Sequence, residues 1–246
     1  MLKKTAICGK GGVGKTTVAA VMARRLRNRK EIRALVVDAD PAGGLGLALG
    51  LAPKKTLNEV RAETIRTIKK AGSDQKELAL TVDYLLLEAV AEIDNLAFLS
   101  IGRPEEKGCY CEVNRLLRDA IESLSAAFDV VLIDGEAGIE QVNRQVMRSM
   151  NNLLLITDPS LKGLRVAESI HQAARQFGLA ASSGIILNRV RDPDDLRRVI
   201  EATTLPVIGS VPEDETIRHF DAQGLSFFEL PECPTTQAVE EILSGR

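Results

Sequence analysis

The stretch Gly9-Lys10-Gly11-Gly12-Val13-Gly14-Lys15-Thr16-Thr17, GKGGVGKTT in one-letter code, separates two segments of different periodicity. Before it, Thr5–Cys8 is a short apolar run that predicts a buried strand, and after it Val18–Arg29 has a helical pattern. The nine residues fill the pattern G-x-x-x-x-G-K-[ST], which is typical of phosphate-binding loops between a strand and a helix. Average residue frequencies would produce this pattern by chance in about one chain of this length in a hundred. We therefore predict that all nine residues contact a nucleotide.

The residue types of this loop each suit one part of a bound triphosphate. Glycines let the backbone N–H groups turn inward around phosphate oxygens, and the start of the following helix adds its positive end. Lys15 is placed to neutralise the β- and γ-phosphates, and the hydroxyl of Thr16 can hold Mg²⁺. The loop thus predicts a P-loop NTPase.

Short apolar runs alternate with helical patterns along the rest of the chain. Strands are predicted at Arg33–Asp38, Leu96–Ile101, Val130–Asp134, Leu153–Thr157, Gly184–Asn188 and Pro206–Gly209, and helices at Leu57–Lys70, Val113–Ala126, Gly163–Phe177 and Asp194–Ala202. From Leu51 to about Glu92 the pattern is otherwise irregular and polar. The alternation predicts an α/β fold with a doubly wound, mostly parallel sheet, helices on both faces, and one domain over residues 1–246.

The composition excludes several classes of function. Aromatic residues make up 3% of the 246 residues, Trp is absent and the net charge is −2, which argues against nucleic-acid partners. No apolar run is long enough for a membrane span and no signal peptide precedes the first strand, so we expect a cytoplasmic protein with reduced cysteines. We interpret Cys8 as a core residue and Cys233, in a Pro-rich tail, as incidental.

Two of the predicted strands end in acidic residues. Asp38 and Asp40 close the second strand, and Asp134 closes the run Val130–Ile133. The carboxyl ends of the strands form the ligand-binding edge of such a sheet, so these carboxylates can bind Mg²⁺ through water or orient an attacking water. The alternative is that they are turn formers or helix caps.

The second lysine of the loop, Lys10, gives the sequence a resemblance to the deviant Walker A family, which includes MinD, ParA and the nitrogenase iron protein. The resemblance implies an ATP-dependent homodimer in which Lys10 reaches the nucleotide of the partner subunit. It also implies that Asp40 positions the water, that Asp134 is the Walker B-like aspartate, and that Gly138 senses the γ-phosphate. Glu136 stands where many relatives have proline, which points away from MinD and ParA.

The family places the adenine beside an amide that follows a later strand. Here Asn188 ends the run Ile186–Asn188, and Val211–Asp214 can form the opposite wall. Asn and Pro are also frequent loop residues. The resemblance therefore implies a base pocket at Asn188 and this run, with Pro212 and Glu213 as its binding residues.

Cys109 and Cys111 are separated by one residue, in Gly108–Glu112. Two thiolates supply half of a soft-metal site, and a two-fold dimer would supply four, enough to close a Zn²⁺ or Ni²⁺ site on its axis. The alternative is a pair of small apolar side chains packed in a loop.

With these residues together, the chain is similar over nearly its full length to the CooC family of nickel-insertion ATPases, which mature carbon monoxide dehydrogenase. The resemblance rests on the loop, on residues 38–41 and 102–111, and on Asp134–Glu140 with Arg144, whereas Gln141 replaces an expected histidine. It implies ATP, Mg²⁺ and Ni²⁺ or Zn²⁺ as cofactors. It also implies a homodimer in the ATP- or metal-bound state, with apo carbon monoxide dehydrogenase as its client.

Two alternative functions stay open. A positioning or partition ATPase acting on membrane or DNA would need a basic C-terminal helix or a basic patch. Glu240 and Glu241 fit the first poorly. A basic patch is present at Arg24, Arg25, Arg27, Arg29, Lys30 and Arg33, but a solvated face and end of the first helix explain it equally well. An iron–sulfur reductase would need cluster cysteines that lie farther apart in the sequence than Cys109 and Cys111.

Overall fold

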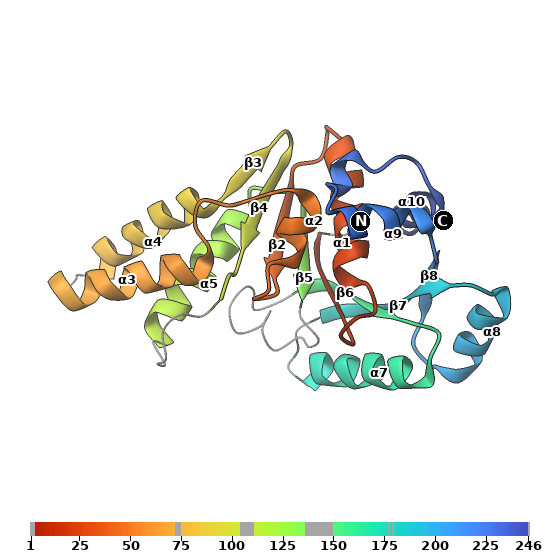
Figure 1. Cartoon of the computed structure of the whole chain (residues 1–246). Helices are drawn as coiled ribbons and strands as arrows, with labels where there is room; N and C mark the ends of the chain where they lie inside the picture. The colour runs from red at the N-terminus through yellow and green to blue at the C-terminus, as the bar shows by residue number, and fades with distance from the viewer. Residues whose placement is uncertain are drawn as a thin grey trace.

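The protein is described from a computed structural model, over residues 3–71, 75–103, 111–135, 150–176, 178 and 180–245. Strands and helices alternate along these residues (Figure 1). The strands are β1 (Lys4–Gly9), β2 (Ala34–Ala39), β3 (Ala91–Ile93), β4 (Leu96–Ser100), β5 (Val130–Gly135), β6 (Met150–Thr157), β7 (Ala180–Val190) and β8 (Val207–Pro212). The helices are α1 (Lys15–Asn28), α2 (Gly44–Leu49), α3 (Leu57–Ala71), α4 (Gln75–Ala89), α5 (Cys111–Ser125), α7 (Leu161–Gln176), α8 (Pro193–Ala202), α9 (Glu215–Gln223), the 3₁₀ turn η1 (Phe227–Glu229) and α10 (Pro234–Ser244).

The strands form one sheet in the order β3-β4-β2-β5-β1-β6-β7-β8. The pairs run parallel except β3 with β4. β1 lies inside the sheet, with β5 on one side and β6 on the other. Chain segments that follow β1 are thus wound outward in both directions, which confirms the predicted doubly wound, mostly parallel α/β fold.

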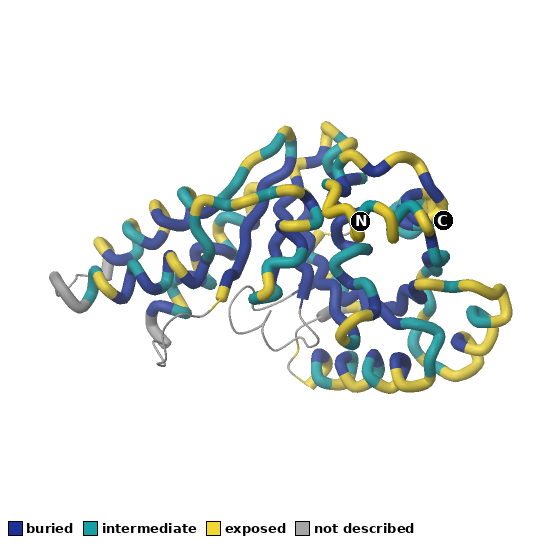
Figure 2. The backbone as a smooth tube through the Cα atoms, viewed as in Figure 1, coloured by how far each residue is buried: buried dark blue, intermediate teal, exposed yellow. Residues whose placement is uncertain are grey.

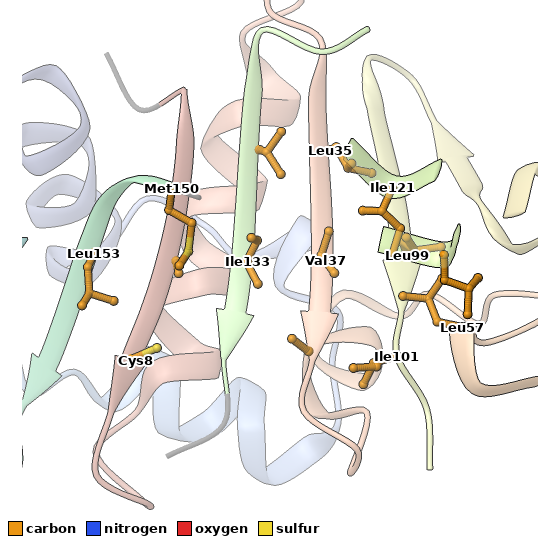
Figure 3. Packing of buried hydrophobic residues seen from close by; sticks show 14 of the residues in the cluster. Cys8, Leu35, Val37, Leu57, Leu99, Ile101, Ile121, Ile133, Met150 and Leu153 are labelled. Atoms are coloured by element: carbon orange, nitrogen blue, oxygen red, sulfur yellow. The ribbon is translucent and has the colours of Figure 1, made fainter. Parts of the chain in front are cut away.

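Helices cover both faces of the sheet because alternate strand residues point to opposite sides. Ala6 and Cys8 belong to a buried cluster with residues of α3, α4, α5 and α7, whereas Ile7 belongs to a second cluster with α1, α2 and α10. Figure 3 shows side chains of the first cluster along neighbouring strands, among them Leu35, Val37 and Ile133. The strands between the helices are buried along most of their length (Figure 2).

Residues 51–92 are more regular than the sequence pattern indicates. They contain α4 as well as the predicted helix α3, and α3, α4 and α5 extend together from one edge of the sheet (Figure 1). Leu80, Tyr84 and Leu87 of α4 are exposed although the helix also buries leucines. Because apolar residues lie on both the buried and the exposed side of α4, the sequence lacks the helical periodicity of an amphipathic helix.

The C-terminal part of the chain is also more ordered than expected. The helices α9 and α10 were not predicted, and α10 begins directly after Cys233. The interpretation of Cys233 as incidental is wrong, because its side chain is 6% exposed and packs in the cluster around α1. Cys8 is fully buried, which confirms its assignment to the core.

No helix in the described part of the chain combines the length and apolar character needed to cross a membrane.

Candidate nucleotide site

Glycines shape the loop between β1 and α1. Gly9 has φ 153° and Gly14 has φ 90°, values that residues with a side chain rarely adopt. A Cβ at Gly9 would lie 2.1 Å from the carbonyl oxygen of Ile156, and one at Gly14 would lie 2.3 Å from Nδ2 of Asn188. The inner side of the loop is therefore packed to contact distance. At Gly11, in contrast, a Cβ would meet nothing within 4 Å, so a side chain there has room.

The start of α1 carries an uncompensated positive end. Gly14 is the N-cap residue, no side chain caps the helix, and its first turn contains no acidic residue. Lys15 is 9% exposed, and its Nζ donates to the carbonyl of Lys10 across the loop at 3.3 Å. A helix N-terminus beside a nearly buried ammonium group is suited to an anion such as a phosphate.

Asp134, at the end of β5, is the buried acid nearest this loop in the sheet. Asp134 is 1% exposed, and in the sheet it lies opposite Ile7 of β1 on one side and Asp38 of β2 on the other. Neither carboxylate oxygen has a well-aligned hydrogen-bond donor. Burial raises the pKa of Asp134 to about 7. The nearby hydroxyl of Thr16 opposes this shift, and the negative charge of Asp38 adds to it.

An unsatisfied buried carboxylate beside a threonine hydroxyl fits a hydrated divalent cation. Mg²⁺ prefers oxygen ligands and keeps several of its waters, so two protein oxygens suffice. Thr16 and Asp134 are the residues that would hold it. The cation or its bound waters would interact with the carboxylate oxygens of Asp134, which lack aligned donors.

Asp38 has a different role from Asp134 although both are buried at strand ends. Its Oδ2 accepts from the backbone N–H groups of Leu45 and Gly46 at 3.0 and 3.1 Å, and its Oδ1 accepts from that of Asp40. Burial raises the pKa of Asp38, while these N–H groups lower it. Asp38 therefore fixes the start of α2, as in the capping alternative.

Asp40 lies between Asp38 and α2 and is half-buried. Its Oδ1 accepts from the N–H of Ala42 at 2.8 Å, which fixes the carboxylate within the turn. A Cβ at Gly44 would lie 3.6 Å from Cγ2 of Thr16, so the segment after Asp40 packs against the phosphate-binding loop. Asp40 is thereby held beside the place where phosphates would lie.

A cavity of about 460 Å³ adjoins the loop. Asn188, Pro212 and Glu213, the three residues expected to surround a base, line it together with Thr17. Asn188 is 5% exposed, and its Nδ2 donates to the carbonyl of Val13 at 2.8 Å. Asn188 therefore ties the cavity to the phosphate-binding loop.

Further residues line the cavity that the sequence analysis did not single out. Arg189 has φ 59° beside an irregularity in the pairing of β7 with β8, an unusual conformation for a residue with a side chain. Arg191 and Glu213 form a two-point ion pair, which lowers the pKa of Glu213. Thr235 completes one wall together with Asp214, which belongs to the predicted run Val211–Asp214. Nothing in the sequence reports the backbone angle of Arg189.

The predicted metal ligands and the predicted γ-phosphate sensor fall in or next to segments outside the described residues. Cys109 and Gly138 lie outside the described residues, and Cys111 begins α5 without a described side chain. The two flanks of the cysteine segment are both held by α3. Nδ2 of Asn58 donates to the carbonyl of Gly102 at 2.9 Å, and Nε of Arg61 donates to Oδ1 of Asn114 at 2.8 Å.

The arginines of α1 do not form a free basic face. Arg24 and Arg25 bind Glu232, and Arg25 and Arg29 bind Glu240. Arg27 binds Asp94. These four arginines are therefore neutralised by acidic side chains, which weakens the interpretation as a DNA patch. Lys30 and Arg33, the other two basic residues of the run, are exposed, as a solvated surface predicts.

The fold and this site together define a P-loop nucleotide-binding protein. The chain belongs to the CobQ/CobB/MinD/ParA nucleotide-binding domain family, whose family model matches residues 4–227.

Relatives of known sequence cover nearly the whole chain. An uncharacterized ATP-binding protein of Methanocaldococcus jannaschii is 33% identical over 96% of this chain and 95% of its own. The carbon monoxide dehydrogenase accessory protein CooC of Rhodospirillum rubrum is 29% identical over 94% and 91%. Among solved structures, the septum site-determining protein MinD of Pyrococcus horikoshii, complexed with Mg-ADP, is similar with a TM-score of 0.69 and 25% identity. That match covers 97% of this chain and 93% of the other.

Proposed function

We propose that this chain is an ATPase that closes as a homodimer around Mg-ATP and carries Ni²⁺ or Zn²⁺ for insertion into carbon monoxide dehydrogenase. The observation that carries the ATPase is the buried, unpaired carboxylate of Asp134 beside Thr16 and an uncapped helix N-terminus. Such a site is electrostatically incomplete without a phosphate and a cation.

The residues of the site would divide the work of hydrolysis. Lys15 and the N–H groups of the loop would hold the β- and γ-phosphates and stabilise the negative charge that moves onto the leaving group. Asp40, held beside the loop by its turn, would orient the attacking water. Thr16 and Asp134 would hold Mg²⁺, which screens the charge of the phosphates. Lys10 would act on the nucleotide of the partner subunit.

The base of the nucleotide would occupy the cavity beside Asn188, Pro212 and Glu213. Its volume of about 460 Å³ falls in the range of small-ligand sites. The glycine at position 138 would report the γ-phosphate to the rest of the chain.

The metal site is proposed at Cys109 and Cys111 of both subunits. Its support is the cysteine pair and the 29% identity with CooC of Rhodospirillum rubrum over 94% of this chain. The described residues on either side of the pair support coupling to the nucleotide. Gly102 and Asn114 bind α3, and α3 follows α2, whose start is fixed by Asp38.

Metal titration of the double variant Cys109→Ala/Cys111→Ala tests the proposed metal site. With Mg-ATP present, wild type is expected to bind one Ni²⁺ or Zn²⁺ per two chains with sub-micromolar affinity, and the variant to bind none at that site. Cys233→Ala is the matched control because it removes a thiol that is 6% exposed in the core. Equal stoichiometry in the double variant and wild type would sink the proposal.

A positioning or partition ATPase acting on membrane or DNA is the second candidate. The observation in its favour is the similarity to MinD of Pyrococcus furiosus, at 26% identity over 99% of this chain. The pairing of the α1 arginines with Glu232 and Glu240 weakens it, because the basic residues are already neutralised. Salt-dependent DNA retention on a filter, or sedimentation with anionic vesicles, would favour this candidate over metal delivery.

A further inference from the structure

The C-terminal segment of the chain forms part of the cavity beside the phosphate-binding loop. Thr235, in the first turn of α10, lines this cavity together with Thr17 of α1. This segment follows residues 4–227, which the family model matches. One wall of the proposed nucleotide site therefore comes from the C-terminal segment.

Asp214 joins the two walls of the cavity. Its Oδ1 accepts from the N–H of Thr216 at 2.9 Å, at the start of α9, and its Oδ2 accepts from the N–H of Thr235 at 3.0 Å. One carboxylate thus caps two helices that are separate in the sequence. Burial alone would raise the pKa of Asp214, but the N–H of Thr235, the thiol of Cys233 and the N–H of Thr216 outweigh it and lower the pKa. Asp214 stays charged, and its charge faces two positive helix ends.

A second set of contacts holds α10 against α1. The carboxylate of Glu232 accepts from Arg24 and Arg25, with 2.5 Å between Nη2 of Arg25 and Oε2. Glu240 pairs with Arg25 and Arg29. The arginine side chains are 11 to 30% exposed, but Glu232 and Glu240 are 55% and 38% exposed, so water screens the pairs and each contributes modestly. We refer to Glu232 and Glu240 with their three arginines as the α1–α10 clamp.

We propose that α10 is a positioning element of the nucleotide site, docked by Asp214 and the α1–α10 clamp, and that nucleotide binding and docking of α10 stabilise each other. The inference rests on the proposed nucleotide site. A ligand that touches Thr235 and Thr17 binds only the docked form, so by linkage it must favour docking. Loss of clamp contacts lowers the docked fraction and raises the apparent dissociation constant by the same factor.

Hydrogen exchange on the full-length protein tests the coupling. At Mg-ADP concentrations of about 100 times Kd, amides of α10 that exchange by local opening should slow by up to about 100-fold. Amides of α8 are the internal control because no residue of α8 lines the cavity.

A pair of variants separates coupling from simple loss of charge. Glu232→Gln/Glu240→Gln weakens the clamp outside the cavity and should raise the Kd for Mg-ADP about three- to tenfold. Asp94→Asn is the matched control, since it removes the partner of another α1 arginine, Arg27, and leaves α10 untouched. Its Kd should stay within about 1.5-fold of wild type.

Each outcome has one meaning. If wild type does not bind Mg-ADP, the proposed nucleotide site fails. If wild type binds it while α10 gains no more protection than α8, or while the two variants have equal Kd, the nucleotide site stands and the coupling is overturned.

Discussion

Replacing Asp134 by asparagine should make the nucleotide-free protein more stable above neutral pH while impairing its proposed activity. Asp134 is 1% exposed, its two oxygens lack aligned donors, and burial raises its pKa to about 7. Folding therefore favours the protonated acid. Asparagine has nearly the same shape and is neutral at every pH, so the variant avoids the buried charge.

The sign and size follow from proton linkage. Between the unfolded pKa of 3.8 and the folded value of about 7, the folded chain binds more protons than the unfolded chain, so stability falls as pH rises. Above pH 8 the cost of the charge reaches about 4 kcal/mol, at about 1.4 kcal/mol per unit. About 2.5 kcal/mol of that cost appears between pH 5 and pH 8.

Urea unfolding at pH 5 and pH 8, without nucleotide or Mg²⁺, measures the effect. The stability of Asp134→Asn relative to wild type should be greater at pH 8 than at pH 5 by about 2.5 kcal/mol. Asp83→Asn, an exposed acid on α4, is the control and should give no such difference. If Asp134→Asn shows the same relative stability at both pH values, Asp134 does not carry the buried charge described here.

Two more substitutions test the packing of the loop. Gly9→Ala should lower the melting temperature by about 5–10 °C, because its Cβ would lie 2.1 Å from the carbonyl oxygen of Ile156, whereas Gly11→Ala should change it by less than about 2 °C; comparable melting temperatures would refute the described loop. Asn188→Ala should destabilise the chain by about 1–3 kcal/mol in urea unfolding, because the carbonyl of Val13 loses a buried donor at 2.8 Å; an unchanged midpoint would show that this hydrogen bond is dispensable.

The loop was predictable because its glycines report backbone conformation directly. Gly9 and Gly14 have positive φ, and the surrounding strand and helix have clear periodicities. The alternation of buried strands and helices predicted the class of fold, but it did not predict the order of the strands in the sheet. The helix α4 was missed because Leu80 and Leu87 are exposed on a helix that also buries leucines.

The roles of the acidic residues could not be separated by sequence. Asp38 and Asp134 both end buried strands, and they are neighbours in the sheet. Backbone N–H groups of α2 donate hydrogen bonds to the carboxylate of Asp38, whereas the carboxylate of Asp134 has no aligned donor. That difference depends on which segment packs above the end of each strand, which the sequence does not report.

The partners of the α1 arginines could not be predicted either, because Glu232 lies more than 200 positions away from Arg24.

Phosphate release from Mg-ATP, measured for wild type and for Lys15→Ala, tests the central claim most directly. Wild type is expected to hydrolyse ATP, and the variant to lose at least about 100-fold in rate, because Lys15 is the cation beside the proposed phosphates. The same low release from both proteins under conditions in which wild type binds ATP, or equal hydrolysis by both, would contradict the claim that this loop is the catalytic site of an ATPase.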